Sequence, residues 1–317
     1  MKHIVETNDA IIPTLEIERI CNLIYHWVEN LRHGACIYGA SRSGKTCTLE
    51  FIEANVQFIF GYKIPCLLLS MWEKDTDASS GKRFWFEFLD VMGHEEAYKG
   101  DGVDKRGRLI EYMIDKMIEC DEKRFLLLID EAQNLENKHF GLLKDLHNRL
   151  RMNKNKYKLI TILVGHPSLR HKKENLAKKG RGDLVGRFML CKDQFKGPHK
   201  SKDLKYICAQ YDRLRWPNSK SPTYTQHFLP LAFENGWRLE NVADRLWTMI
   251  IATLTDLGIK KIEDLPIEPF YAILRALLMQ ASIMDAADFE VSNQMLEQIL
   301  SEFGIEQIVE HTAYQAA

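Results

Sequence analysis

The sequence lacks the signatures of several protein classes. No stretch reaches the roughly 18 uncharged apolar residues of a membrane-spanning helix, so no membrane partner is expected. The N-terminus, Met1 to Asp9, is polar and of mixed charge, which predicts no signal peptide. The seven cysteines are scattered without a Cys-x-x-Cys pair, which indicates free thiols and a cytoplasmic location. Zinc-ligand spacing, His-Glu-x-x-His and Gly-x-Ser-x-Gly are absent, so neither zinc nor serine-hydrolase chemistry is indicated.

The composition that remains is that of an ordinary globular protein. Of 317 residues, 45% are hydrophobic and 27% are charged, enough for one large or two modest domains. The net charge of −1 hides an asymmetry: residues 151–205 hold 16 Lys and Arg against 4 Asp and Glu, and residues 258–317 hold 3 against 10. The first block could contact phosphate groups or form an ordinary solvated face, whereas the second would repel phosphate.

Apolar runs that alternate with helical patterns predict an α/β fold. Buried strands are expected at 35–38, 64–70, 125–129 and 159–164, with a short fifth strand near Phe188 to Cys191. This alternation predicts a parallel five-stranded sheet flanked by helices. Past residue 200 the patterns are helical. The expected divisions are an N-terminal helical segment (1–34), an α/β core (35–200), a helical domain (201–257) and a C-terminal helical extension (258–317).

A phosphate-binding loop is predicted directly after the first strand. The run Gly39-Ala-Ser-Arg-Ser-Gly44-Lys45-Thr46 fits G-x-x-x-x-G-K-[ST] between a predicted strand and a predicted helix. The glycines let backbone N–H groups surround a phosphate, Lys45 reaches the outer phosphates, and the Thr46 hydroxyl ligates Mg²⁺. The expected nucleotide-binding residues are Gly39, Ala40, Ser41, Arg42, Ser43, Gly44, Lys45, Thr46 and Cys47.

A pair of acidic residues supplies the second half of an ATPase site. Asp130 and Glu131 follow the apolar run that ends at Ile129, about 85 residues after the loop. Asp130 is expected to hold Mg²⁺, and Glu131 to polarise the attacking water. The Asn-Lys pairs at 137 and 153 lack the Asp expected for guanine recognition, which favours ATP over GTP.

Three further residues are candidates by position. His166 follows the strand at 159–164 and is either a γ-phosphate sensor or a loop residue. Arg187 precedes the predicted last strand, and Arg238 opens a helix of the second domain. Each arginine is either a surface cation or a group that stabilises charge on a transferring phosphoryl, often in a neighbouring subunit.

Together these motifs resemble the AAA+ superfamily and, within it, the TnsC, TniB and MuB group of transposition regulators. The segments that carry the resemblance are Gly39–Thr46, Leu128-Ile-Asp-Glu-Ala-Gln-Asn-Leu135, Leu163-Val-Gly-His-Pro167, Leu184-Val-Gly-Arg-Phe188 and Gly236-Trp-Arg-Leu-Glu-Asn241. The resemblance spans about Ile11 to Trp247 and implies an AAA+ P-loop ATPase core followed by a helical lid at 201–257. It also implies an adenine contact at Ile12-Pro13, an arginine finger at Arg187 and a second sensor at Arg238. His166 departs from the polar Asn, Thr or Ser usual at the first sensor.

The resemblance also implies partners. Such regulators form rings or helical filaments on duplex DNA, recruit a DDE-type transposase and work beside a TniQ-type adaptor. Their DNA contacts follow the backbone without base readout. The matching basic residues here are Lys82, Arg83, Lys99, Lys105 and Arg106, each of which is alternatively a solvated charge. A replication or repair ATPase such as a helicase loader, and a signalling or defence NTPase with protein partners, remain alternatives.

Overall fold

The structure, a computed structural model, describes residues 2–73, 81–259, 264–303 and 308, and its contacts divide the chain into two units. The first is an α/β unit made of Ile20–Gly39 and Lys45–Phe195. The second is a helical unit made of Met1–Arg19, Ala40–Gly44 and Lys196–Ala317. The five central residues of the phosphate-binding loop therefore belong by their contacts to the helical unit.

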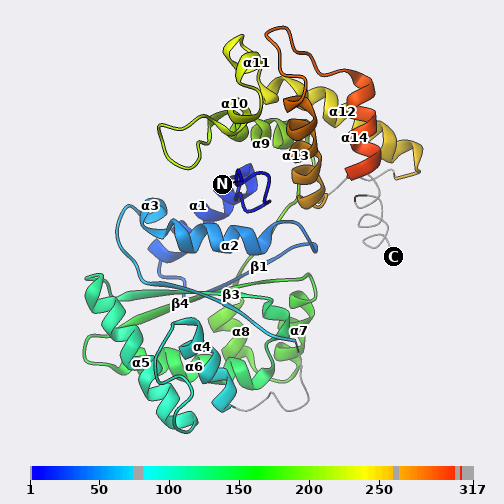
Figure 1. The fold of residues 1–317 in the computed structure, drawn as a ribbon. Coiled ribbons are helices and arrows are strands. Elements are labelled where there is room, and N and C mark those ends of the chain that lie inside the picture. Colours follow the sequence, from blue (N-terminus) through cyan, green and yellow to red (C-terminus); the bar gives the residue numbers. More distant parts are fainter. Residues whose placement is uncertain (1, 74–80, 260–263, 304–307, 309–317) are drawn as a thin grey trace. The chain divides into compact units, whose positions relative to one another are not determined.

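The α/β unit is built on a parallel sheet of five strands in the order β2-β3-β4-β1-β5 (Figure 1). The strands are β1 (Gly34–Tyr38), β2 (Cys66–Ser70), β3 (Arg124–Asp130), β4 (Lys158–Gly165) and β5 (Cys191–Gln194). Every residue of β3 after Arg124 is buried, as expected for a continuous apolar run covered on both faces. The predicted fold class is confirmed in its architecture: a parallel five-stranded sheet flanked by helices, with a helical region after the sheet.

The fifth strand lies later in the chain than the sequence predicted. Phe188 is the last residue of helix α8 and is fully buried, and β5 begins only at Cys191. The apolar residues Phe188 and Leu190 suggested a strand there. Phe188 instead belongs to a helix, and its side chain packs against the sheet. Gly34 permits this arrangement, because a Cβ on it would lie 2.6 Å from the Phe188 Cα.

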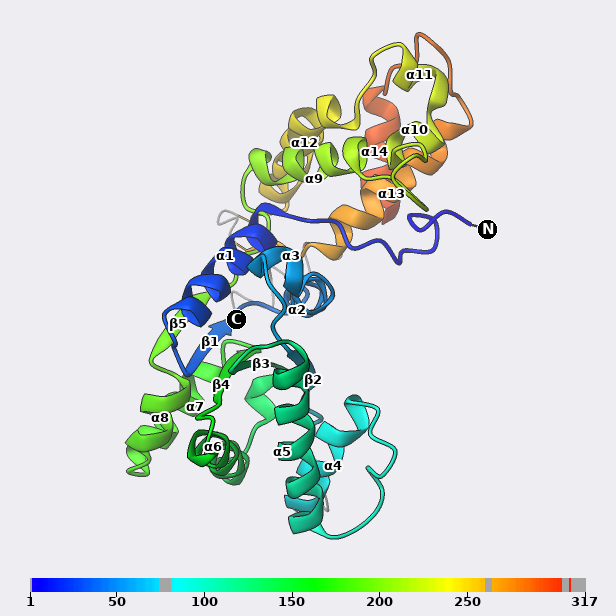
Figure 2. The same ribbon diagram turned by 90° about the vertical axis from the view of Figure 1, so that its left-hand side faces the viewer.

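Helices cover both faces of this sheet. Figures 1 and 2 show α2 and α3 on one face, and α4, α5, α6 and α8 on the other. The helices before and between the strands are α1 (Leu15–Glu29), α2 (Lys45–Ala54), α3 (Val56–Phe60), α4 (Gly81–Val91), α5 (Gly102–Glu119), η1 (Ala132–Asn134), α6 (Asn137–Met152), α7 (Leu169–Lys178) and α8 (Gly182–Phe188). Apolar residues of α4 to α8 and of the strands form one buried cluster that includes Phe84, Phe125, Phe140 and Phe188.

The regular elements of the second unit, in its described residues, are helices. It contains α9 (Ser201–Arg213), α10 (Tyr224–Phe228), α11 (Pro230–Glu234), η2 (Leu239–Val242), α12 (Ala243–Asp256), α13 (Glu268–Ser282) and α14 (Asn293–Phe303). Residues on both sides of the expected boundary at 257/258, such as Leu246 and Leu274, share one apolar cluster with Val5 and Ile12. Among the described residues, no helix is both long and apolar enough to cross a membrane.

Candidate nucleotide site

The candidate site lies where strands β1, β3 and β4 end. In a parallel sheet the carboxyl ends of the strands meet at one edge, and a ligand binds beside the point where strand order reverses. Strand β1 lies between β4 and β5, so this reversal occurs at β1. The loop after Tyr38, the acidic pair at the end of β3 and the His166 loop after β4 therefore meet at the carboxyl edge.

The loop backbone has the form that phosphate binding requires. Arg42 and Gly44 have φ values of 55° and 101°, which turn successive N–H groups to one side of the chain. Gly39 is needed for packing, since a Cβ there would lie 2.8 Å from the Phe195 Cβ. Within the helical unit, the backbone N–H of Ile267 donates to the Arg42 carbonyl at 3.0 Å. Cys47, one residue beyond the motif, is exposed on α2.

Lys45 is held at the start of α2 with its ammonium group turned back to the loop. Its side chain is buried, and Nζ donates to the Gly39 carbonyl at 3.0 Å. Burial lowers the pKa of Lys45, while the charges of Asp130 and Glu131 oppose that shift. The amine is thus kept beside two carboxylates, where a polyphosphate would give it further negative partners.

Thr46 and Asp130 form the contact expected of a magnesium site. The Thr46 hydroxyl donates to Asp130 Oδ2 at 2.6 Å, although the two residues are 84 positions apart. Asp130 Oδ1 accepts the backbone N–H of Glu131 at 2.8 Å, which fixes the carboxylate orientation. Hydroxyl and carboxylate oxygens are the ligands that Mg²⁺ prefers, so the pair fits this ion through one or two protein ligands.

Glu131 adopts a backbone conformation that is uncommon for its type. Its φ of 50° places it in the left-handed region, a cost that proteins tolerate mainly at functional positions. This turn ends β3 and directs the Glu131 carboxylate toward Gln133, whose Nε2 donates to Glu131 Oε2. The candidate base is thereby held by a side chain that follows it by two residues.

Gln133 is the site residue that sequence reasoning missed. Besides holding Glu131, it accepts the backbone N–H of His166 through Oε1 at 2.9 Å. A Cβ on Gly165 would collide with this amide, which gives the glycine before His166 a steric reason. The sequence contains a signal for this residue, because Gln133 belongs to the Asp-Glu-Ala-Gln run that carries part of the family resemblance.

Helix α7 is tied to the same turn. Lys172 donates through Nζ to the carbonyls of Gln133 and Leu135, and Arg170 donates to the Tyr38 hydroxyl with its guanidinium over the Tyr38 ring. The His166 side chain is exposed, with Nδ1 3.3 Å from Ser168 Oγ. The structure thus connects the His166 loop to Glu131 through Gln133, whereas the sensor role of the imidazole stays a prediction.

The two candidate arginines lie in different units. Arg187, on α8, donates to Asn148 Oδ1 at 2.8 Å and lies at the amino edge of the sheet. Arg238, in the helical unit, donates to the carbonyls of Phe233 and Trp237, with its guanidinium carbon 3.6 Å from the Phe233 ring centroid. Ile12 is buried in the helical unit, where its carbonyl accepts from Tyr271, and Pro13 is partly buried.

Most of the basic residues expected to contact DNA are paired with groups of the protein itself, and one of them is buried. Lys105 is 1% exposed, and its Nζ donates to the carbonyls of Ala97 and Lys99. This corrects the prediction for Lys105, because a buried ammonium group that already binds two carbonyls cannot reach a phosphate backbone. The others pair locally or lie on the surface: Arg83 with Glu87, Lys99 with Glu96, Arg106 with Asp145, and Lys82 exposed on α4.

Comparisons with known proteins bear on the domain and the fold. The model of the AAA domain family matches residues 31–172. The Aeropyrum pernix ORC2 protein, solved as ADPNP-ADP complexes, has a TM-score of 0.56 at 14% identity over 95% of this chain and 72% of its own. The Aeropyrum pernix ORC1 protein in complex with DNA has a TM-score of 0.51 at 12% identity over 94% and 68%. No curated protein matches the sequence.

Proposed function

We propose that this protein is a magnesium-dependent ATPase. The observation that carries the proposal is the 2.6 Å contact between Thr46 and Asp130, formed beside a buried Lys45 and a strained Glu131. Bound Mg²⁺ would neutralise charge on the β- and γ-phosphates. The structurally similar ORC2 protein was solved with ADPNP and ADP, which supports an adenine nucleotide as ligand.

The residues at the carboxyl edge of the sheet have separate roles in hydrolysis. Lys45 binds the outer phosphates, and Thr46 and Asp130 hold the metal ion. Glu131 accepts a hydrogen bond from the attacking water and orients it in line with the γ-phosphate. Gln133 fixes the Glu131 carboxylate and also accepts a hydrogen bond from the backbone N–H of His166. One side chain therefore connects the candidate base to the loop that follows β4.

Arg187 is proposed to act on the nucleotide of a neighbouring subunit. It lies at the amino edge of the sheet, whereas Lys45 and Asp130 lie at the carboxyl edge of the same strands. A strand of five residues spans roughly 16 Å, so Arg187 is too far from its own site to contact a phosphate there. An arginine finger at this position requires a homo-oligomer, for which the resemblance to ring- and filament-forming regulators is the support.

The biological role proposed is regulation of DNA transposition. In this role the protein assembles on duplex DNA with ATP and recruits a DDE-type transposase beside a TniQ-type adaptor. The motifs from Gly39 to Asn241 support it, and a structural relative, the ORC1 protein, was solved in complex with DNA. A replication or repair ATPase would share every nucleotide residue. The two roles are separated by a strand-transfer assay with the transposase of the same transposable element. Stimulation of strand transfer by this protein supports the transposition role.

The ATPase proposal is tested with two variants of one site. Lys45→Ala removes the cation that binds the outer phosphates and should abolish ATP binding. Glu131→Gln keeps the size of the side chain but weakens water activation, so it should bind ATP and lower kcat by a factor on the order of 100 or more. Binding is measured with a fluorescent ATP analogue and turnover by phosphate release. Wild-type turnover by Glu131→Gln would disprove the catalytic assignment.

A further inference from the structure

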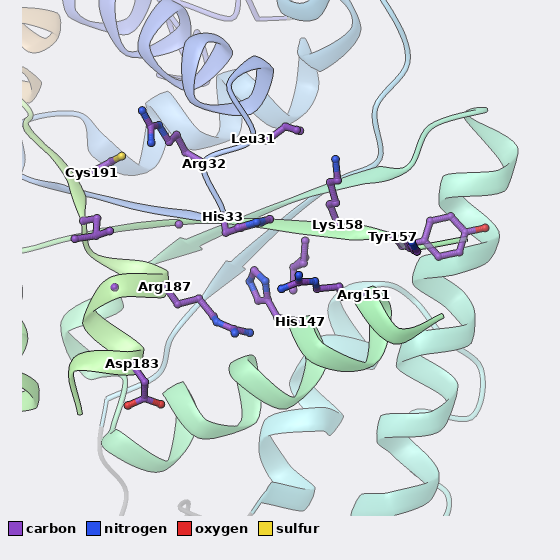
Figure 3. Close-up of a pocket in the computed structure, with 15 residues that line it drawn as sticks. Leu31, Arg32, His33, His147, Arg151, Tyr157, Lys158, Asp183, Arg187 and Cys191 are labelled. Carbon is purple, nitrogen blue, oxygen red and sulfur yellow. The ribbon is translucent and has the colours of Figure 1, made fainter. Parts of the chain in front are cut away.

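A cavity lies at the opposite edge of the sheet from the nucleotide site. It has a volume of about 730 Å³ and is formed where β1, β4 and β5 begin (Figure 3). His33 precedes β1, Lys158 is the first residue of β4 and Cys191 the first of β5, while Arg151 and Arg187 come from the ends of α6 and α8. All lining residues belong to the α/β unit.

The charge in this pocket is strongly unbalanced. Its cations are Arg32, Arg151, Lys156, Lys158 and Arg187. Its one acidic residue, Asp183, is already engaged by Lys144 at 2.7 Å and Arg181 at 3.2 Å. Arg187 bonds to the neutral Asn148 amide, and none of the other four cations forms an ion pair with a carboxylate in the described part of the chain. The pocket therefore lacks its own counter-charge.

The two histidines of the pocket report the same excess of positive charge. Burial lowers the pKa of His147 to about 3, and Arg187 contributes to the shift. Desolvation lowers the pKa of His33, with Arg187, Arg151 and Lys158 acting in the same direction. The neutral His147 ring shares a hydrogen bond with Thr161 Oγ1 at 3.1 Å. Figure 3 shows this ring between the side chains of Arg187 and Arg151.

The arrangement of the cations favours an extended anion over a small one. In Figure 3, Arg187 and Arg151 lie on one side of the strands, and Arg32 and Lys158 rise on the other. This spread over two sides matches successive phosphates along a polymer better than one compact anion. The only phenol ring in the lining, Tyr157, is 3% exposed and accepts from Asn155, so it offers no open face for stacking a nucleobase.

We propose that the cations of this pocket other than Arg187, which is assigned to a neighbour's nucleotide, bind backbone phosphates of duplex DNA. That the phosphates belong to duplex DNA rests on the proposed function. That the pocket binds anions rests on its cations, which have no carboxylate partners among the described residues. Contacts of this kind position DNA without reading its sequence. The DNA surface is thereby assigned to residues around Arg151, Lys156 and Lys158 instead of the basic residues of α4 and α5.

The test compares two matched triple variants of the full-length protein with an ATP analogue bound. The pocket variant carries Arg151→Gln, Lys156→Gln and Lys158→Gln, and leaves Arg187 intact because of its proposed role in hydrolysis. The control carries Arg83→Gln, Lys99→Gln and Arg106→Gln, which removes equal charge from α4, α5 and the turn between them. A third variant, Arg151→Lys with Lys156→Arg and Lys158→Arg, keeps the pocket's charge.

DNA affinity is then measured across a salt series on two unrelated duplex sequences. Each lost phosphate contact should reduce the slope of log affinity against log salt by roughly 0.9, so the pocket variant should lose up to about 2.7 on both sequences. The control and the charge-keeping variant should retain the wild-type slope. All variants should hydrolyse ATP without DNA at the wild-type rate, which confirms that they fold.

The outcomes separate this proposal from the proposed function. A wild-type slope in the pocket variant, or a loss confined to the control, overturns the pocket assignment while DNA binding by the protein stands. A wild-type protein that binds no duplex overturns both the pocket assignment and the DNA role, and leaves the ATPase intact. Binding of tripolyphosphate to the Lys45→Ala protein, lost in the pocket variant and unaffected by duplex, would show a small-anion site and would also overturn the proposal.

Discussion

The two edges of the sheet both carry cations, but they compensate them differently. At the carboxyl edge, Lys45 is buried beside Asp130 and Glu131, and its ammonium group bonds to the Gly39 carbonyl. At the amino edge, Arg151 and Lys158 face further cations and two neutral histidines. A cation that is neutralised within the fold can be held in one geometry for catalysis. Uncompensated cations raise the electrostatic energy of the protein until an anion arrives.

The basic residues of α4 and α5 provide a third case. There the charges are satisfied by neighbouring carboxylates or carbonyls, as in the Arg106–Asp145 pair at 3.1 Å and the buried Lys105. A phosphate group that displaced these partners would have to match contacts that already exist. The three regions thus have different capacities for a new ligand, and the difference lies in the partners of their cations.

The largest expected effect concerns two lysines from contrasting regions. Lys105→Met keeps the apolar stem but leaves the carbonyls of Ala97 and Lys99 without their donor. We expect it to lower the free energy of unfolding by about 2 kcal/mol or more. Lys158→Met removes an uncompensated charge and should change that free energy by less than about 0.5 kcal/mol. Urea denaturation followed by tryptophan fluorescence measures both, and equal losses would contradict the contrast.

These cases show what the sequence could predict. The phosphate-binding loop and Asp130 were predictable because the chemistry fixes residue types and spacing over short segments. The buried position of Lys105 was not predictable. It depends on a hydrogen bond to the carbonyl of Ala97, which lies in the turn between α4 and α5. No local pattern distinguishes a lysine that binds carbonyls inside the fold from one that is solvated.

The sheet shows the same limit at its edge. Strands β1, β3 and β4 were predicted within about one residue, because long apolar runs covered on both faces carry a strong signal. Strand β5 pairs with β1 alone, and its sequence, Cys-Lys-Asp-Gln, has no apolar run, so the prediction moved toward Phe188. The amino-edge pocket was equally hidden, since it joins residues from 31 to 191 that come together only in the fold.

A smaller effect is expected at the carboxyl edge, from Gln133. Gln133→Ala removes the amide that orients Glu131 and should lower kcat for ATP by about tenfold with little change in KM. Gln133→Glu places a second carboxylate beside Glu131, so repulsion between the two like charges should displace the base and lower kcat at least as far. Steady-state kinetics between pH 5 and 9 test both. Faster hydrolysis by Gln133→Ala would mean that Gln133 restrains Glu131.

The smallest effect concerns the electrostatic field at the amino edge. Desolvation together with the charges of Arg187, Arg151 and Lys158 lowers the pKa of His33, and the His147 ring that packs against it is neutral. Arg151→Gln removes one of these charges, so the pKa of His33 should rise toward its ordinary value. In the wild type, phosphates bound in the pocket should also raise the pKa of His33, because negative charge favours the protonated ring. NMR titration of the His33 ring protons follows both changes, and Arg83→Gln on α4 serves as the control that should leave the titration unmoved. A His33 titration indifferent to Arg151→Gln would mean that the pocket's charges are screened by solvent, and the contrast between the two edges would then lose its electrostatic basis.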